Sequence, residues 1–188
     1  MLRKLILVIP CTLSLALADF DRQAAVLDLS SRIGEGASGL LSMTQAMTVA
    51  GLPYMVTTNP GEAVQHPVVY VACRIPSATL TREEVDLVRD YLNAGGTLVA
   101  SYVADPRLYD FFGVNPPAAS NQRHRLTWNV AGGDPTTKWF NDDNEVTISL
   151  GNPGYPSIFY TQSYVCKAAT PLALFDDATV AASVNRYG

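Results

Sequence analysis

The chain has 188 residues, which is enough for one domain with a real hydrophobic core. Its formal net charge is −4, its sequence pI is about 5.0, and 48% of its residues are hydrophobic. This composition excludes a disordered chain and a basic surface for nucleic acid, so we expect a folded domain that binds no nucleic acid.

The first 18 residues are predicted to be a signal peptide. Two basic residues precede an apolar run over residues 5–17, and Ala16-Leu17-Ala18 fits the small-x-small pattern at which signal peptides are cleaved. We therefore expect a mature chain that starts at Asp19, has no membrane span after signal removal, and is secreted or periplasmic. An uncleaved anchor and a lipoprotein attached through Cys11 are the alternatives.

The mature chain opens with a predicted strand, helix and strand. Ala24–Leu29 is an apolar strand, a loop rich in Gly and Ser follows, and Ser38–Ala50 is a helix. The helix residues expected to face the core are Leu40, Leu41, Met43, Met47 and Ala50. Tyr54–Thr57 is a second short strand, and Asn59-Pro60-Gly61 favours a turn.

The middle of the chain carries the clearest pattern. Val68–Ala72 is an apolar strand, and Thr81 with Glu84 three residues later forms a capping box that begins an amphipathic helix. Gly95-Gly96 ends this helix, and Thr97–Val103 is again apolar and β-branched. A strand, helix and strand with tight connections predict a right-handed crossover in a parallel sheet.

After Val114 the sequence changes to short β-like segments separated by Gly, Pro and Asp. The predicted segments are Leu126–Val130, Glu145–Leu150, Ser157–Tyr160, Pro171–Phe175 and Val180–Asn185. The fold class is therefore α/β, with a three-layer, mostly parallel, doubly wound sheet and a β-rich C-terminal half. We expect one domain over residues 19–188, with the β-rich extension starting at about residue 115.

Three phrases carry a family resemblance: LTREEVDLVRDYLNAGGTLVAS, DPRLYDFFGV and LALFDDATVAASVNRYG. In these phrases the chain resembles the class I glutamine amidotransferase-like superfamily. Within it, the chain looks like the non-catalytic extracytoplasmic branch found with polysaccharide deacetylases and glycoside hydrolases. The resemblance implies an amidotransferase-like α/β domain. Such domains usually continue beyond the Tyr-Gly with a further strand, so it also suggests truncation at the C-terminus.

The sequence departs from the catalytic members of that superfamily. They place a cysteine in a Gly-x-Cys-x-Gly elbow, where the residues here are Ser101–Asp105, with neither the cysteine nor the glycines. The downstream His-x-Glu pair is also missing, because His124 is followed by Arg125 and Leu126. A glutaminase is therefore disfavoured, and we expect no cofactor and no resident metal.

Four residues remain as candidates for a site: Asp28, Cys73, Ser101 and Asp105. Each is predicted to lie near or just after the carboxyl end of a strand, and ligands of open α/β sheets bind beyond these ends. Two carboxylates there could hold a metal or act in acid–base chemistry. Each candidate also has a structural interpretation: Asp105 is a natural helix N-cap before Pro106, and Cys73 could be buried.

Cys73 and Cys166 remain after removal of the signal peptide. In an oxidising compartment they could form a disulfide, and two buried free thiols are the alternative.

Aromatic residues are numerous around the expected ligand edge and the β-rich half. They are Tyr102, Tyr109, Trp128, Trp139, Tyr155, Tyr160 and Tyr164. Their rings could form a platform for sugar rings, or they could serve only the packing of the core.

The expected function is a non-catalytic extracytoplasmic accessory or interaction domain, linked to polysaccharide or cell-envelope processing. Its partner would be a polysaccharide or another envelope protein. Two alternatives stay open: a hydrolase acting at the carboxyl edge of the sheet, and the N-terminal fragment of a larger polysaccharide-active enzyme.

Overall fold

The computed structural model describes residues 23–138, 140, 142–150 and 160–187. The predicted signal peptide, Trp139 and Tyr155 lie outside the described residues. Within the described ranges, no helix is long and apolar enough to cross a membrane.

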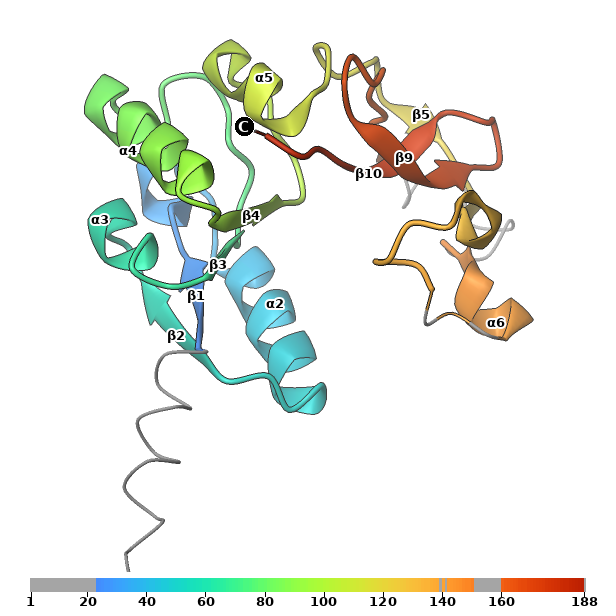
Figure 1. The fold of residues 1–188 in the computed structure, drawn as a ribbon, viewed down its shortest axis with the longest axis horizontal. Helices are drawn as coiled ribbons and strands as arrows, with labels where there is room; N and C mark the ends of the chain where they lie inside the picture. The colour runs from blue at the N-terminus through green and yellow to red at the C-terminus, as the bar shows by residue number, and fades with distance from the viewer. Residues whose placement is uncertain (1–22, 139, 141, 151–159, 188) are drawn as a thin grey trace, which may run out of the picture. The chain divides into compact units, whose positions relative to one another are not determined.

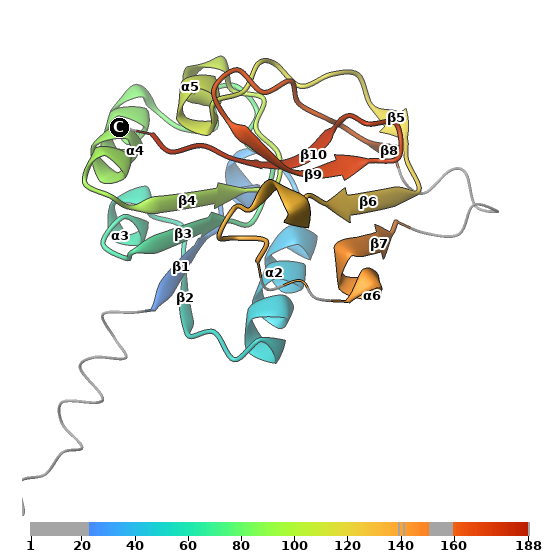
Figure 2. The ribbon, with the colours of Figure 1, turned by 45° about the vertical axis from the view of Figure 1, so that its right-hand side comes forward.

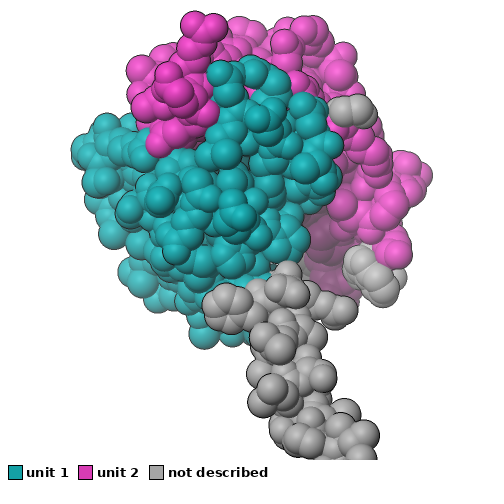
Figure 3. Space-filling view, turned by 60° about the vertical axis from the view of Figure 1, so that its left-hand side comes forward, with its two compact units in different colours: residues 1–74, 86–101 teal, residues 75–85, 102–188 magenta. Residues whose placement is uncertain are grey.

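The chain divides into two compact units, coloured separately in Figure 3. Unit 1 comprises Met1–Arg74 and Asp86–Ser101, and unit 2 comprises Ile75–Val85 and Tyr102–Gly188. Each unit has its own sheet. The expectation that residues 19–188 act as one domain stays a prediction.

Unit 1 contains the predicted parallel sheet. Its strands are β1 (Ala24–Leu27), β2 (Tyr54–Thr57), β3 (Val68–Val71) and β4 (Thr97–Ala100), in the order β2-β1-β3-β4 (Figures 1 and 2). All three neighbouring pairs are parallel. β1 is the most deeply buried strand, with Ala25 and Val26 fully buried, and like β3 it has a neighbouring strand on both sides. The α/β class with a parallel sheet is confirmed.

The helices of unit 1 cover both faces of this sheet. They are α2 (Ser38–Val49), the four-residue α3 (Pro60–Ala63) and α4 (Arg82–Asn93), which begins in unit 2. The crossover through α2 runs across the sheet in one direction, and those through α3 and α4 run in the other. Because parallel crossovers are right-handed, α2 lies on one face and α3 and α4 lie on the opposite face (Figure 1).

The helix α3 stands where the sequence favoured only a turn. Asn59 is its N-cap: the side-chain Oδ1 accepts the Gly61 N–H at 2.9 Å. Pro60 occupies the first helical position, where its missing N–H costs nothing. The turn chemistry was therefore recognised correctly, but it begins a helical turn that residues Pro60–Ala63 complete.

The ends of α4 follow the prediction. The Thr81 N–H donates to Glu84 Oε2 at 2.9 Å, and the Glu84 N–H donates to Thr81 Oγ1 at 3.2 Å, so the capping box is formed. Gly95 takes the left-handed conformation with φ of 93°. A Cβ on Gly96 would lie 2.2 Å from the Tyr91 ring, which explains why the second residue is also glycine.

One predicted burial pattern and one predicted strand boundary are wrong in part. In α2, Met47 is buried and Leu40 and Met43 pack against the core, but Leu41 is 58% exposed and Ala50 is exposed. The buried arc of the helix is narrower than its run of apolar residues. The strand predicted over Thr97–Val103 ends as β4 at Ala100. Its side chains are half-exposed because β4 is at the edge of the sheet.

Unit 2 holds the predicted β-rich half. An antiparallel sheet has the order β10-β9-β6-β7, and β5 pairs with β8 in a small second sheet. The strands are β5 (Asn121–Gln122), β6 (Arg125–Trp128), β7 (Thr147–Ser149), β8 (Tyr160–Thr161), β9 (Thr170–Phe175) and β10 (Val180–Val184). Its short helices are η2 (Pro106–Leu108), α5 (Tyr109–Phe112), η3 (Val130–Gly132) and α6 (Asp143–Val146). The helix α6 corrects the strand predicted to begin at Glu145.

A buried arginine organises the interior of unit 2. The Arg123 side chain is 3% exposed and donates from Nε to Asp177 Oδ2 at 2.8 Å. Its other nitrogens donate to the Thr161 carbonyl at 2.5 Å and to Ser163 Oγ at 3.1 Å. The guanidinium also lies 4.7 Å from the centre of the Phe175 ring. Each of the three guanidinium nitrogens therefore donates a hydrogen bond, and a buried charge needs such partners to be stable.

Candidate functional site

The carboxyl ends of the four parallel strands form one edge of unit 1, which we call the carboxyl edge. It comprises residues 28–38 after β1, Thr58 and Asn59 after β2, Cys73 and Arg74 after β3, and Ser101 after β4. β1 lies between β2 and β3, and the connections to these strands run in opposite directions. Open α/β sheets bind their ligands at such a topological switch point.

Asp28 shapes the start of the loop after β1. Its Oδ1 accepts the Ser30 N–H at 3.0 Å, and its own N–H donates to the Thr57 carbonyl at 2.8 Å. The second bond extends the pairing of β1 with β2 by one residue. Asp28 is therefore a turn-forming residue at the carboxyl edge, and its carboxylate is half-buried.

Cys73 is buried, with 6% of its surface exposed. Burial raises the pKa of its thiol, and a backbone hydrogen bond at Leu29 lowers it. The carboxylates of Asp28 and Glu35 raise this pKa further, while Arg74 lowers it. Because only the thiolate is a strong nucleophile, a buried thiol that retains its proton favours the structural interpretation of Cys73.

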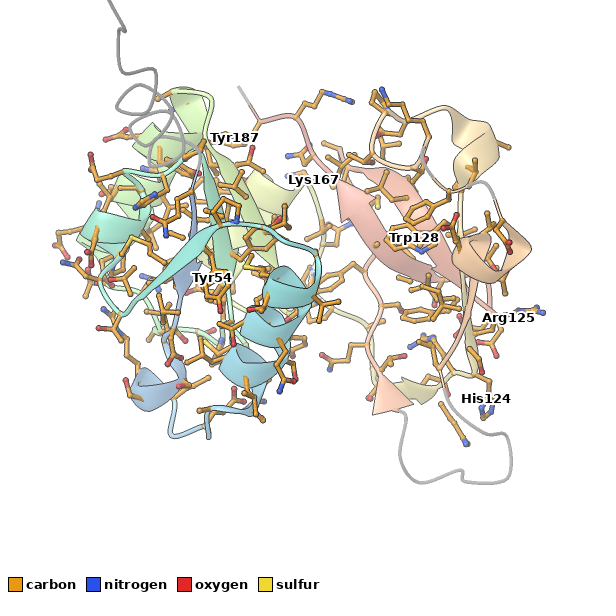
Figure 4. All side chains as sticks on the ribbon, turned by 90° about the horizontal axis from the view of Figure 1, so that it is seen from below. Tyr54, His124, Arg125, Trp128, Lys167 and Tyr187 are labelled. Carbon is orange, nitrogen blue, oxygen red and sulfur yellow. The ribbon has the colours of Figure 1, made fainter. Side chains whose placement is uncertain are left out.

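Ser101 is exposed at the end of β4, but no histidine of unit 1 is placed to activate it. His66 lies at the opposite end of the strands, where its Nδ1 is 2.9 Å from the carbonyl oxygen of Gln23, just before β1. His124 belongs to unit 2, beside Arg125 at the start of β6 (Figure 4). A serine nucleophile needs a base within hydrogen-bonding reach, and unit 1 supplies no histidine for it among its described residues.

Asp105 belongs to unit 2 and is 1% exposed. Its Oδ1 accepts the Arg107 backbone N–H and the guanidinium Nε, each at 3.0 Å, and its Oδ2 accepts Nη2 at 2.5 Å. Arg107 Nη2 also donates to the Leu80 carbonyl at 2.7 Å. Asp105 caps the short helix η2, as its position before Pro106 predicts.

The pKa of Asp105 reflects these contacts. Burial alone would raise the pKa, but the hydrogen bonds from Arg107 and its positive charge outweigh burial, so the pKa lies below the usual value. A backbone hydrogen bond at Ala78 acts in the same direction. Ala78 has a positive φ of 64°, so the carboxylate also holds a strained turn. The buried Asp105 carboxylate therefore has a structural role in unit 2, where it caps η2 and pairs with Arg107.

The loop after β1 contains a spacing that was not among the predicted candidates: Gly34-x-Gly36-x-x-Gly39. Gly34 has a positive φ of 66°, and a Cβ on Gly39 would lie 2.2 Å from the Ala72 carbonyl oxygen. The third glycine therefore lets the first turn of α2 approach the end of β3. The spacing itself is readable in the sequence, and loops of this kind can approach phosphate groups.

An ion pair makes this loop a poor site for an anion. The Arg74 guanidinium Nε donates to Glu35 Oε1, joining the end of β3 to the glycine loop. Glu35 stands between Gly34 and Gly36, where a phosphate would otherwise meet backbone N–H groups. Its carboxylate neutralises Arg74, and the exposed polar side chains of the loop are the hydroxyls of Ser31 and Ser38 together with the charged Arg32.

Three of the predicted aromatic candidates come together in unit 2. The Tyr109 hydroxyl donates to the Ala104 carbonyl at 3.1 Å, and the Tyr164 hydroxyl bonds to the backbone of Val103. Burial raises the pKa of Tyr164, and the neighbouring phenols of Tyr102 and Tyr109 raise it further. Trp128 instead stacks on Phe140, with ring centres 5.0 Å apart.

Both cysteines are free thiols, Cys73 in unit 1 and Cys166 in unit 2. Burial raises the pKa of Cys166, and a hydrogen bond with the Ser183 side chain lowers it. Their pairing in an oxidising compartment stays a prediction. Across the described ranges, no group of three or more His, Cys, Asp or Glu side chains is placed to hold a metal ion.

Comparison with solved structures places this architecture among known folds. The chain is similar to a ThuA-like protein of Bacteroides uniformis, with a TM-score of 0.55 and 15% sequence identity over 83% of this chain and 68% of that chain. ThuA-like proteins belong to the class I glutamine amidotransferase-like superfamily, so the likeness supports an amidotransferase-like fold. No family model and no curated protein matches the sequence.

Proposed function

We propose that this chain is a non-catalytic extracytoplasmic binding domain, whose ligand is a polysaccharide held at the carboxyl edge of unit 1. One observation carries the proposal: the reactive thiol and the Arg74 cation of the carboxyl edge are buried or paired, and its other exposed polar groups are neutral apart from Arg32. Cys73 is buried, and Arg74 is paired with Glu35. Ser31, Ser38, Asn59 and Ser101 stay exposed, with hydroxyl and amide groups that match sugar hydroxyls.

The choice of a neutral ligand follows from the same contacts. An anionic ligand would need a free cation, but the carboxylate of Glu35 already neutralises Arg74. A sugar needs hydrogen-bond donors and acceptors without net charge, and the carboxyl edge offers these. The sequence resemblance to domains that accompany polysaccharide deacetylases and glycoside hydrolases supports the same class of ligand.

Binding without turnover is the result that tests this function. The purified protein would be titrated with soluble chitin, cellulose and xylan oligosaccharides, and the release of reducing ends would be measured in parallel. We expect binding to at least one of them, no release of reducing ends, and a loss of affinity of about tenfold or more in Ser38→Trp. The matched control is Gln65→Trp, an exposed position before β3, at the other end of the strands. No binding to any of the three, or equal losses in both variants, would reject the proposal.

A second function has one observation in its favour. Asp28 and Glu35 both raise the pKa of the Cys73 thiol, so two carboxylates lie in the neighbourhood of Cys73 at the carboxyl edge. Paired carboxylates are the groups that hydrolyse glycosidic bonds. A hydrolase would release reducing ends, and Asp28→Asn and Glu35→Gln would each abolish the release while leaving binding intact.

A further inference from the structure

One segment of unit 1, which forms α2 and β2, contains no charged residue. From Gly36 to Gly61 the chain has no charged residue and no histidine, although a run of this length would carry about four charges at the overall charged fraction of 16%. Four large apolar side chains of this segment are exposed: Leu41 by 58%, Val49 by 89%, Leu52 by 49% and Val56 by 46%. We call the surface formed by these four residues the α2–β2 flank.

The members of the flank lie along α2 and β2. The hydroxyls of Thr48 and Tyr54 are 3.1 Å apart, so this side of α2 faces the same side of β2 that carries Tyr54 (Figure 4). Side chains two residues apart on a strand share a face, so Val56 lies on this side as well. Leu41 lies about two helical turns before Thr48, on the same side of α2. Leu41 and Val56 therefore lie on the same side of α2 and β2, and Val49 and Leu52 belong to the end of α2 and to the segment that leads into β2.

The edge strand β2 has unpaired backbone groups. The carbonyls of Pro53 and Thr57 accept hydrogen bonds from Ala24 and Asp28 at 3.0 and 2.8 Å, so the backbone groups of Tyr54 and Val56 point away from β1. β2 is the last strand of its sheet among the described residues. Edge strands of monomers are usually protected by short length, charged side chains, proline or a bulge; β2 has only four residues and follows Pro53, but it carries no charged residue.

We propose that the α2–β2 flank is the surface through which two copies of this chain associate, with β2 pairing antiparallel to β2 of the second copy about a two-fold axis. A two-fold interface uses the same patch on both copies, so the patch must be complementary to itself. Two chains of net charge −4 repel each other, and the residues of the flank add no charge to their contact, while the Glu62 carboxylate lies at the end of β2, bonded to the Thr57 hydroxyl. This inference is independent of the ligand at the carboxyl edge.

Two other surfaces are less suited to this role. A lipid surface attracts apolar patches that are bordered by Lys and Arg, and the run from Gly36 to Gly61 has neither. The opposite edge of the sheet, β4, also lacks charge, but the helix that leads into it carries Asp86, Arg89 and Asp90. The α2–β2 flank combines an open strand edge with an uncharged helix.

Sedimentation velocity on the purified chain, with its N-terminus established by mass spectrometry, tests the proposal. We expect a dimer. We expect Val56→Lys and Val49→Lys each to raise its dissociation constant by about tenfold or more. The matched control is Val99→Lys on β4, where the wild-type side chain is 36% exposed and the dimer should persist. Circular dichroism checks that each variant folds. Val49 is so exposed that its variant remains informative where Val56→Lys disturbs the strand.

Amide hydrogen exchange adds a readout for strand pairing. The Tyr54 and Val56 amides should exchange slowly at concentrations that favour the dimer and faster on dilution. Four results would overturn the proposal: a monomeric wild type, a dimer that survives both lysine variants, a dimer weakened equally by Val99→Lys, or exchange at these amides that ignores concentration. A monomer that sediments with phosphatidylcholine vesicles through the same residues would instead identify a lipid-binding surface and would also overturn it.

Discussion

The Tyr164 side chain takes the place of a neighbouring strand for Val103. Its hydroxyl accepts the Val103 N–H at 2.8 Å and donates to the Val103 carbonyl at 2.9 Å. One phenol thus satisfies both backbone groups of a residue that is only 4% exposed. Sixty-one residues separate the two positions in the sequence, so this contact ties the beginning of the long C-terminal segment of unit 2 to its later part.

Removal of this hydroxyl should destabilise the fold. In Tyr164→Phe the buried amide and carbonyl of Val103 lose their partner, and each unsatisfied buried group is costly, so we expect a loss of about 2 kcal/mol in the free energy of unfolding. Urea unfolding followed by circular dichroism measures the loss. Tyr109→Phe is the control: it breaks a single bond to the Ala104 carbonyl, and its cost should be clearly smaller. Equal stabilities of the two variants would contradict this role of Tyr164.

Gly39 should be the least replaceable glycine of the loop after β1. A Cβ at this position would lie 2.2 Å from the Ala72 carbonyl oxygen, so α2 must move away from the end of β3, and we expect Gly39→Ala to cost about 2 kcal/mol. Gly36→Ala is the matched control, since nothing lies within 4 Å of its Cβ position and its φ is not positive, and it should change stability by less than about 1 kcal/mol. Thermal unfolding of both variants tests the difference.

The Asp177 carboxylate should make stability depend on pH in the acid range. Hydrogen bonds from Thr179, and then from Arg123, lower the pKa of Asp177 from 3.8 to about 2. A carboxyl group with a lowered pKa contributes stability that is fully present above its unfolded pKa and is lost as the pH falls through its folded pKa. The contribution should therefore decline from about pH 4 to about pH 2.

Asp177→Asn tests this dependence directly. At neutral pH the variant should lose about 2 kcal/mol, because the buried Arg123 guanidinium loses its anionic partner. It should also lack the part of the acid-induced decline that Asp177 causes in the wild type. Asp110→Asn is the control, because the exposed pair of Asp110 with Lys167 should contribute little. An unchanged acid profile in Asp177→Asn would contradict the assignment.

The Cys73 thiol should react slowly in the native protein. Burial raises its pKa and restricts access, so alkylation by iodoacetamide at neutral pH should be at least about tenfold slower than in the urea-unfolded chain. Peptide mapping by mass spectrometry separates Cys73 from Cys166. Rapid labelling of native Cys73 would revive its candidacy as a nucleophile. If neither cysteine is labelled in the unfolded chain until a reductant is added, the predicted disulfide is formed.

Local signals account for the parts of the fold that the sequence predicts correctly. The Thr81–Glu84 capping box, the Gly95-Gly96 stop and the capping role of Asp105 each depend on residues within a few positions of one another. The strands β9 and β10 were predicted close to their observed bounds, because their apolar runs are bordered by clear turn residues. Such features need no knowledge of the tertiary structure.

Long-range contacts explain what the sequence could not predict. The exposure of Leu41 depends on how α2 is rotated about its own axis where it packs on the sheet. The exposure of the β4 side chains depends on the position of β4 at the edge of the sheet. At the candidate site, the neutralising pair of Glu35 with Arg74 joins residues that are 39 positions apart. The three-glycine spacing after β1 was readable, but the need for Gly39 appears only when Ala72 is placed beside it.

The division of the chain into units has a consequence for any attempt to separate them. The backbone passes from one unit to the other three times, after Arg74, after Val85 and after Ser101. A fragment that starts at Tyr102 would therefore lack Ile75, which pairs with Val103, and the Leu80 carbonyl that Arg107 binds. No single cleavage can release either unit intact, so proteolysis or gene truncation would leave two incomplete pieces. Modular exchange of one half between proteins would have to carry both segments of its unit together.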